Sequence, residues 1–293
     1  IAAIAFLAFR NRVMFKMAIR NIPRRRAQST LIVAGLMLAT LLFSASFATG
    51  DTISHSIRVS VLSAVGQVDE VVQSESVDNA GRRDFFEYSA YERVRDGLVN
   101  APVDGVMPAV NFTVPVIAPS TNLSEPAVEL SGLDPALMEG FDPLKAIGSG
   151  QTLDIALLGT NDVYLSQRVA DAINVSTGAK INLFFGIEPT EVEVKGLYLD
   201  GGNGGQSAFM QLSALQALVN EKGRINRIFI SNDGDLINGA EYSDAVMAAL
   251  EPLLEGSLLE ADALKEDLLE LADLVGSAFT SIFVLFGSFS IIA

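Results

Sequence analysis

The side chains that most often carry out catalysis are scarce in this chain of 293 residues. It contains no cysteine and a single histidine, His55. The lack of cysteine excludes disulfide scaffolds, zinc-thiolate sites and cysteine nucleophiles, and one histidine excludes most histidine-based catalytic constellations. We interpret His55 as a surface or stalk residue. We predict that the chain is not an enzyme, with no catalytic residue, no cofactor-binding residue and no metal ligand.

The polar clusters of the sequence favour loops and turns over ligand sites. The glycine-rich Asp200–Gly205 lacks the lysine and the Ser/Thr of a phosphate-binding loop, and no such loop occurs elsewhere. Any ATP that drives this protein is therefore hydrolysed by another subunit. Asp233–Asp235 resembles the start of a calcium loop, but no suitably spaced bidentate glutamate follows, so we interpret it as a turn. Three carboxylates are assigned to the exposed face and edge of a strand: Glu188, Glu191 and Glu193.

The charges are divided unevenly along the chain. Residues 1–50 contain seven Arg and Lys residues and no acidic residue, whereas the remainder contains 13 basic and 35 acidic residues, a net charge of −22. Basic segments are retained on the cytoplasmic side of a membrane, while an acidic surface is tolerated outside. The division predicts two compartments. It also argues against nucleic acid as a partner of the acidic part, which would repel phosphate.

Two uncharged segments are long enough to cross a bilayer. Residues 27–50 and 274–293 form runs of 24 and 20 residues without a charge, and a helix rises about 1.5 Å per residue. We predict a transmembrane helix over each run, and we expect the chain to be an excerpt of a longer polypeptide that cuts the second helix short. A cleaved signal peptide is the alternative for the first run, since Arg24–Arg26 precede it and Ser46–Ala48 resembles a cleavage site.

The segment that precedes the first span, residues 10–26, is basic and amphipathic. Its basic residues recur mostly at every fourth position while apolar residues fill the other faces, which is typical of a helix lying on a membrane surface. Pro23 would then supply the bend into the span. A solvated basic linker is the alternative, and either interpretation places the segment in the cytoplasm. Residues 1–9 are apolar but too short to cross, and we interpret them as the tail of a preceding transmembrane helix.

Apolar residues at heptad-like spacing flank the acidic part of the chain. A 4-3-4 spacing occurs after the first span and again before the second. We predict that residues 51–80 and 257–273 form stalk helices that continue the spans outward and pack against each other. Ordinary helices that face a domain core are the alternative. The residues predicted to pack in the stalk are Ile57, Val61, Val68, Leu264, Leu268 and Leu271.

Between the stalks, residues 81–256 alternate strand patterns with helix patterns. The expected strands are Val110–Ile117 (broken at Pro115), Ala127–Leu133, Lys180–Phe185, Glu191–Tyr198 and Arg224–Ile230. The expected helices are Tyr88–Val99, Asp162–Ile173, Ser207–Asn220 and Tyr242–Leu254. We therefore predict an integral membrane protein with α-helical spans and an extracytoplasmic α+β domain. This domain contains a mixed sheet and forms either one lobe or two.

Two stretches of the sequence resemble the FtsX-like and MacB-like permease subunits of ABC transporters. Met17–Gly35 is similar to the cytoplasmic entry helix of the family, and Asp162–Asn182 followed by Val194–Gly196 is similar to its outer core domain. Phe209–Gln216 fits the helix that commonly comes next in the family. The motifs are degenerate, but the order of span, stalk, outer domain, stalk and span matches over nearly the whole chain from Phe15. The apolar segment before residue 10 departs from the minimal four-span plan.

The resemblance implies a permease that couples ATP hydrolysis by a partner ATPase to motion of the extracytoplasmic domain, for export, lipoprotein release or mechanotransmission. The implied partners are an ABC-type ATPase subunit, a second permease copy or a paralogue, and the lipid bilayer. The implied location is the cell membrane, with several spans and with residues 51–273 outside the cytoplasm. A membrane-anchored binding or sensor protein without an ATPase is the alternative. The candidate ATPase-coupling residues are Arg12, Lys16, Arg20, Arg24, Arg25 and Arg26.

Overall fold

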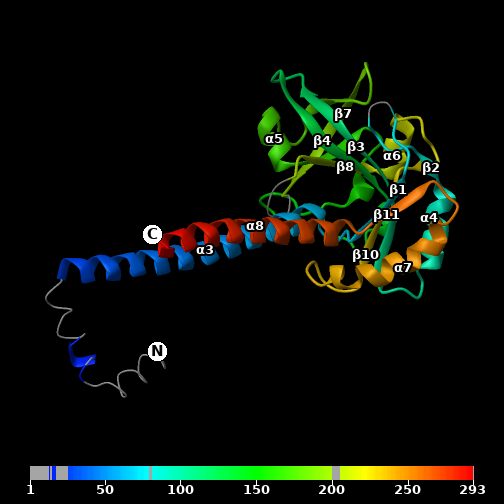
Figure 1. Cartoon of the computed structure of the whole chain (residues 1–293). Helices are drawn as coiled ribbons and strands as arrows, with labels where there is room; N and C mark the ends of the chain where they lie inside the picture. Colours follow the sequence, from blue (N-terminus) through cyan, green and yellow to red (C-terminus); the bar gives the residue numbers. More distant parts are fainter. Residues whose placement is uncertain (1–12, 14, 18–25, 79–80, 200–204, 293) are drawn as a thin grey trace. The chain divides into compact units, whose positions relative to one another are not determined.

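The computed structural model describes residues 13, 15–17, 26–78, 81–199 and 205–292, and the chain divides into two compact units. The first unit contains the N-terminal part of the chain to Ser56 and the C-terminal part from Ala272. The second unit is the continuous segment Ile57–Leu271. Helices α3 (Arg26–Val65) and α8 (Leu264–Ile292), drawn in blue and red in Figure 1, each run from one unit into the other.

Helix α3 contains the one described helical segment that is long and apolar enough to cross a membrane, Arg26–Leu62, in which an 18-residue window has a mean hydropathy of 2.2. Leu31 and Ile32 on this helix are 74% and 66% exposed. A bilayer would remove such apolar surface from contact with water, which is the main force that keeps a helix in the membrane. Residues 274–293 do not meet the same criterion within the described residues, so the second span stays a prediction.

The second unit is an α+β domain with a mixed sheet, as the sequence predicted. Its strands are β1 (Glu70–Ser74), β2 (Phe86–Glu87), β3 (Val103–Ala118), β4 (Leu123–Leu133), β5 (Asp162–Ser166), β6 (Lys180–Phe184), β7 (Pro189–Tyr198), β8 (Ser207–Gln211), β9 (Arg224–Ile225), β10 (Arg227–Asn232) and β11 (Leu259–Asp262). Its helices are α4 (Tyr88–Gly97), α5 (Gln167–Ile173), α6 (Leu212–Leu218) and α7 (Ser243–Leu254). Short 3-10 helices lie at Pro135–Leu137, Ile155–Leu157 and Gly239–Tyr242.

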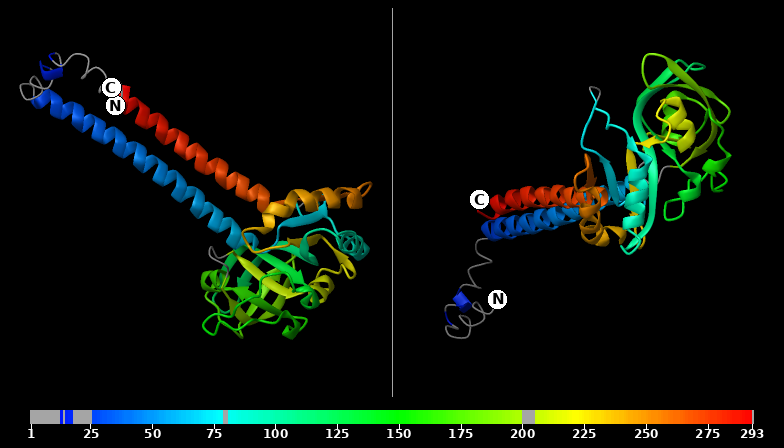
Figure 2. Two further views of the ribbon diagram at one scale, coloured as in Figure 1. Left: turned by 90° about the horizontal axis from the view of Figure 1, so that it is seen from below. Right: turned by 90° about the vertical axis from the view of Figure 1, so that its right-hand side faces the viewer.

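Nine strands of this domain form one sheet in the order β11-β1-β10-β3-β4-β8-β5-β7-β6. Strand β3 pairs a second time, with β6, so the strands from β3 to β6 close into a ring that Figure 2 shows end-on in its right-hand view. The pairings β4–β8 and β5–β7 are parallel and the others are antiparallel. Strands β2 and β9 form a separate two-stranded antiparallel sheet, and the whole segment Ile57–Leu271 is one compact unit, not two lobes.

The length of β3 allows it to belong to both halves of the sheet. Its first half pairs with β10 and its second half with β4, and the register shifts between Val114 and Val116. Pro115 lies at this irregularity and is exposed, which suits a residue that has no N–H to give to the ladder. We expected the strand Val110–Ile117 to be broken at Pro115. The strand instead continues through a bulge because the bulge removes the need for that hydrogen bond.

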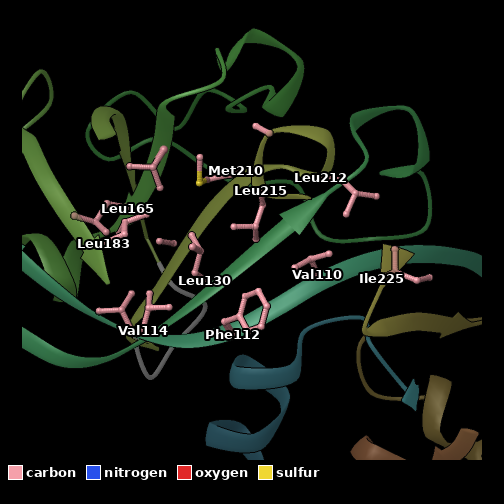
Figure 3. Packing of buried hydrophobic residues seen from close by; sticks show 14 of the residues in the cluster. Val110, Phe112, Val114, Leu130, Leu165, Leu183, Met210, Leu212, Leu215 and Ile225 are labelled. Carbon is pink, nitrogen blue, oxygen red and sulfur yellow. The ribbon is translucent and has the colours of Figure 1, made fainter. Parts of the chain in front are cut away.

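The main core lies inside the ring and beneath the helices that cover it. Val110, Phe112 and Val114 of β3 alternate inward with a period of two, as a strand requires, and pack with Leu130 and Leu165 (Figure 3). All five side chains are buried. A smaller second core gathers seven buried residues: Met107, Ala109, Leu133, Ile155, Leu158, Tyr164 and Tyr198.

In two of the predicted helices, Asp162–Ile173 and Ser207–Asn220, the first five residues form a strand instead. Residues Asp162–Ser166 and Ser207–Gln211 form β5 and β8, and the helices begin only at Gln167 and Leu212. Both strands are central and pair in parallel with a neighbour, and such strands carry continuous apolar runs that resemble buried helices. Ser166 marks the true start of α5, because its side chain accepts a hydrogen bond from the Val169 N–H as an N-cap.

The sheet extends beyond the limits of 81 and 256 that we expected for the outer domain. Helix α3 ends at Val65, and part of the segment predicted as stalk helix, residues 51–80, forms strand β1. Part of the return stalk, residues 257–273, forms β11 before α8 begins at Leu264. Strand β1 is five residues long and fully buried, so it has no alternating polar face to distinguish it from a helical seam.

Candidate functional site

The predicted ATPase-coupling cluster lies mostly outside the described residues. Arg12, Arg20, Arg24 and Arg25 belong to that part of the chain. Lys16 and Arg26 are described, and both are exposed. The cluster therefore remains a prediction from the sequence.

The predicted stalk residues differ in exposure. Ile57, Val61, Val68, Leu264 and Leu268 are all partly buried. Leu271, in contrast, is 53% exposed, while the next residue, Ala272, is fully buried. The buried face of α8 therefore passes through Ala272 at this point, and Leu271 is not on it.

Within the first unit, α3 and α8 approach each other through small residues. Ser54 Oγ donates a hydrogen bond of 3.2 Å to Asp273 Oδ1. A Cβ added at Gly50 would lie 3.2 Å from Thr280 Cβ and closer still to the Thr280 hydroxyl, and one at Gly276 would lie 2.6 Å from Ser54 Cβ. A larger residue than glycine at either position would therefore push the two helices apart. Small residues let helix backbones approach in this way in membranes.

Within the second unit, a buried ion pair joins the chain just after α3 to the first turn of α8. Lys265 Nζ lies 2.6 Å from Asp69 Oδ1, and the two side chains are 1% and 2% exposed. The backbone N–H of Lys265 donates to the Asp69 carbonyl at 3.1 Å. Asp69 Oδ2 accepts from the N–H of Asn232, the last residue of β10, at 2.8 Å. The pair therefore connects both helix ends to the sheet.

Glu70 lies beside this ion pair and is itself buried. Its Oε1 accepts a hydrogen bond of 2.8 Å from Asn232 Nδ2, which also donates to the Gly239 carbonyl at 3.0 Å. The pKa of Glu70 is raised to about 7, mainly by burial and also by the charge of Asp69, while Ser243, Asn232 and Lys265 act in the opposite direction. We call Asp69, Glu70, Asn232 and Lys265 the junction. It holds a fixed ion pair and a carboxyl group that changes charge near neutral pH.

The junction was missed in the sequence because its members look ordinary there. Asp69 and Glu70 belong to an acidic surface pattern, and Lys265 begins a helix rich in charged residues. An available signal was the interruption of the apolar seam by Asp69 and Glu70 directly before Val71 and Val72, which is typical of a helix end followed by a strand. In the described part of the chain, no three His, Cys, Asp or Glu side chains are placed to hold a metal ion.

A family model described as the MacB-like periplasmic core domain matches residues 29–253. The chain belongs to this family. The match runs from α3 through α7, so it includes the ring of strands and three of the four junction residues. The MacB-like permease family predicted from Met17–Gly35 and Asp162–Asn182 is confirmed, and the second unit is the extracytoplasmic domain of an ABC-type transporter permease of the MacB-like family.

Solved structures of MacB-like domains are similar to this chain at low identity. The periplasmic region of MacB from Actinobacillus actinomycetemcomitans is 14% identical, with 69% of this chain and 93% of that chain covered and a TM-score of 0.43. The extracellular domain of the ABC-type transporter YknZ from Gram-positive bacteria is 12% identical, with 67% and 99% covered and a TM-score of 0.43. A search of curated proteins found no match.

Proposed function

We propose that this chain is the permease subunit of an ABC transporter and that it transmits motion from a partner ATPase to its MacB-like domain. The ATPase acts on the basic segment 10–26, and α3 carries the movement across the membrane. A second permease copy or a paralogue completes the transporter.

The junction is the observation that carries this proposal. Asp69 follows the end of α3 and Lys265 lies in the first turn of α8, so a displacement of either helix acts on the same ion pair. Because both charges are buried, separating them would leave each without a partner in a medium of low dielectric constant, which opposes independent movement of the two helix ends. Asn232 extends the connection to β10 and hence to the sheet.

The first experiment is a pull-down of the full-length protein from solubilised membranes, with quantification of any ABC-type ATPase that co-purifies. We expect a stoichiometric ATPase, and we expect it to be lost when Arg20, Arg24, Arg25 and Arg26 are replaced by Ala. The matched control replaces four lysines of the outer domain by Ala and removes the same number of positive charges: Lys145, Lys180, Lys195 and Lys222. The control should retain the ATPase.

The absence of an ATPase in several detergents would contradict the proposal and favour a membrane-anchored sensor. Equal loss in both quadruple variants would show that net charge, and not the basic segment, governs the association. A Lys265→Met variant that keeps its ATPase but no longer changes the protease sensitivity of the outer domain on ATP addition would support transmission through the junction. If ATP still changed the protease sensitivity of the Lys265→Met variant as in the unmodified protein, transmission through the junction would be excluded.

A further inference from the structure

A groove between α7 and β11 is separate from the junction and from the helices of the first unit. It is a cavity of about 780 Å³ lined by residues of α7, of the turn at 255–258 and of β11, together with Glu75. Its apolar lining includes Met247, Leu254 and Leu259, all partly buried. The volume lies within the range of about 300–1,000 Å³ that is usual for ligand pockets.

The residues that line this groove carry negative charge and no positive charge. Four of the lining residues are glutamates, and none is Lys, Arg or His. Glu260 already pairs with Arg83, at 2.7 Å. Among the described residues, no basic side chain lies within ion-pair distance of Glu75, Glu251 or Glu255, and all three are exposed. Arg83, which also donates to the Glu75 carbonyl at 3.5 Å, therefore compensates the acidic rim at one end, and the carboxylates of Glu251 and Glu255 give its negative charge at the other.

The backbone of α7 adds negative potential to the same groove, independently of the glutamates. The helix is twelve residues long and has no basic residue in its last turn to offset the partial negative charge of its C-terminus. Pro252 lies inside the helix and has no N–H, so the Ala248 carbonyl lacks its helical donor. Both residues line the groove. A bound group with several N–H donors would satisfy these acceptors.

The other wall of the groove is the end strand of the sheet. Strand β11 pairs with β1, and β1 pairs on its other side with β10, so β11 has a free edge among the described strands. The Glu75 N–H donates to the Leu258 carbonyl at 2.9 Å, and in an antiparallel pair every second residue bonds to the same neighbour. The N–H and C=O groups of Leu259 and Ala261 therefore point away from β1. The Leu259 N–H donates to Ser257 Oγ at 3.3 Å, so an added strand would pair through the Leu259 C=O and the N–H and C=O of Ala261.

We propose that this groove binds an extended basic peptide segment in which lysine or arginine alternates with apolar residues. The peptide backbone pairs with β11, its basic side chains meet Glu75, Glu251 and Glu255 in the groove, and the intervening apolar side chains point away from α7. The alternation follows from the period of two in an extended chain. The proposal concerns the outer domain alone and does not depend on the ATPase.

The test uses the full chain in nanodiscs of phosphatidylcholine, with empty nanodiscs as background. The probe is a fluorescein-labelled peptide Lys-Val-Lys-Val-Lys-Val, followed by fluorescence anisotropy, with Glu-Val-Glu-Val-Glu-Val as the matched control. We expect saturable binding of the basic peptide and none of the acidic one. The triple variant Glu75→Gln, Glu251→Gln and Glu255→Gln should weaken binding about tenfold, the sum expected for three exposed charge pairs.

The control variant removes three exposed carboxylates elsewhere on the domain: Glu92→Gln, Glu139→Gln and Asp171→Asn. It should bind as the unmodified chain does, and equal weakening in both variants would overturn the proposal in favour of attraction by net charge. A basic peptide N-methylated at alternate residues should also bind at least about tenfold more weakly, because it cannot pair with β11. Equal binding by the N-methylated peptide, or full competition by free lysine at the same amine concentration, would overturn it in favour of a site for small amines.

Discussion

At the scale of single residues, we expect substitutions of the buried charged residues to have the largest effects on stability. A lone buried charge is far less stable than a paired one, because the protein interior replaces water poorly around an ion. Lys265 and Asp69 are almost completely buried as a pair. The effect of substitution should therefore depend on whether one partner or both are removed.

We expect Lys265→Met to lower the free energy of unfolding by about 3–5 kcal/mol, since Asp69 is then buried without a partner. The double variant Lys265→Met and Asp69→Asn should lose less, because Asn can still accept the Asn232 N–H. Lys180→Met is the control, since its ion pair with Glu191 is exposed and should matter little. Urea unfolding of the full-length protein measures all three, and a double variant less stable than Lys265→Met would contradict the pairing argument.

Glu70 should make stability depend on pH near neutrality. Its pKa is raised from an ordinary value of 4.5 to about 7 in the folded protein, mainly by burial. The folded state therefore binds more protons than the unfolded state between these values, so the contribution of Glu70 to stability is full at low pH and is lost as the pH rises through 7. Relative to Glu70→Gln, the unmodified protein should lose about 3 kcal/mol from about pH 4 to about pH 8. Parallel pH profiles of the two proteins in urea would exclude a shifted Glu70.

At the scale of elements, the close contact of α3 and α8 can be tested by cross-linking. The chain has no cysteine, so an engineered pair has no competitor. The pair Gly50→Cys and Thr280→Cys should form a disulfide on mild oxidation, because a Cβ at Gly50 lies 3.2 Å from Thr280 Cβ and small shifts bring it to disulfide geometry. The control pair Gly35→Cys and Thr280→Cys should not, since nothing lies within 4 Å of a Cβ at Gly35. The readout is the shifted band on a non-reducing gel.

The seam predicted for the stalk should respond to charge at Leu268 more than at Leu271. Leu268 is partly buried whereas Leu271 is 53% exposed, so Leu268→Asp should lower the free energy of unfolding by about 2 kcal/mol and Leu271→Asp by clearly less. Thermal unfolding of the full-length variants measures the difference. If the stalk transmits motion, Leu268→Asp and Val61→Asp should also abolish transport while the ATPase still co-purifies. Equal destabilisation by the two leucine substitutions would remove Leu268 from the seam.

At the scale of the whole molecule, the charge division predicts opposite sides of the membrane for the two ends of α3. Lys16 and Lys222 are both exposed, and they lie in the basic segment and the outer domain. In right-side-out vesicles, Lys222→Cys should react with a membrane-impermeant maleimide and Lys16→Cys should not. Inside-out vesicles should reverse the pattern. Reaction of both cysteines in sealed right-side-out vesicles would contradict a span between them.

The sequence by itself was sufficient for the class of fold, the family and the apolar span in α3. These depend on local properties, namely the length of an uncharged run, the distribution of charge and the period of apolar residues, all of which are present before the chain folds. The strand character of Asp162–Ser166 and Ser207–Gln211 depended on the sheet. The first is buried at four consecutive positions and so has no period of its own, and the second is only five residues long and leads directly into a helix.

Only the tertiary structure decided which residues form the junction. Asp69, Asn232 and Lys265 lie far apart in the chain, and each is a common surface residue type. Their burial, the pairing of two charges and the raised pKa of Glu70 arise from what the fold places around them, since the energy of a charge is set by its surroundings and not by its neighbours in sequence. The groove at β11 could not be predicted from the sequence either, because β11 has a free edge only by virtue of its place at the end of the folded sheet.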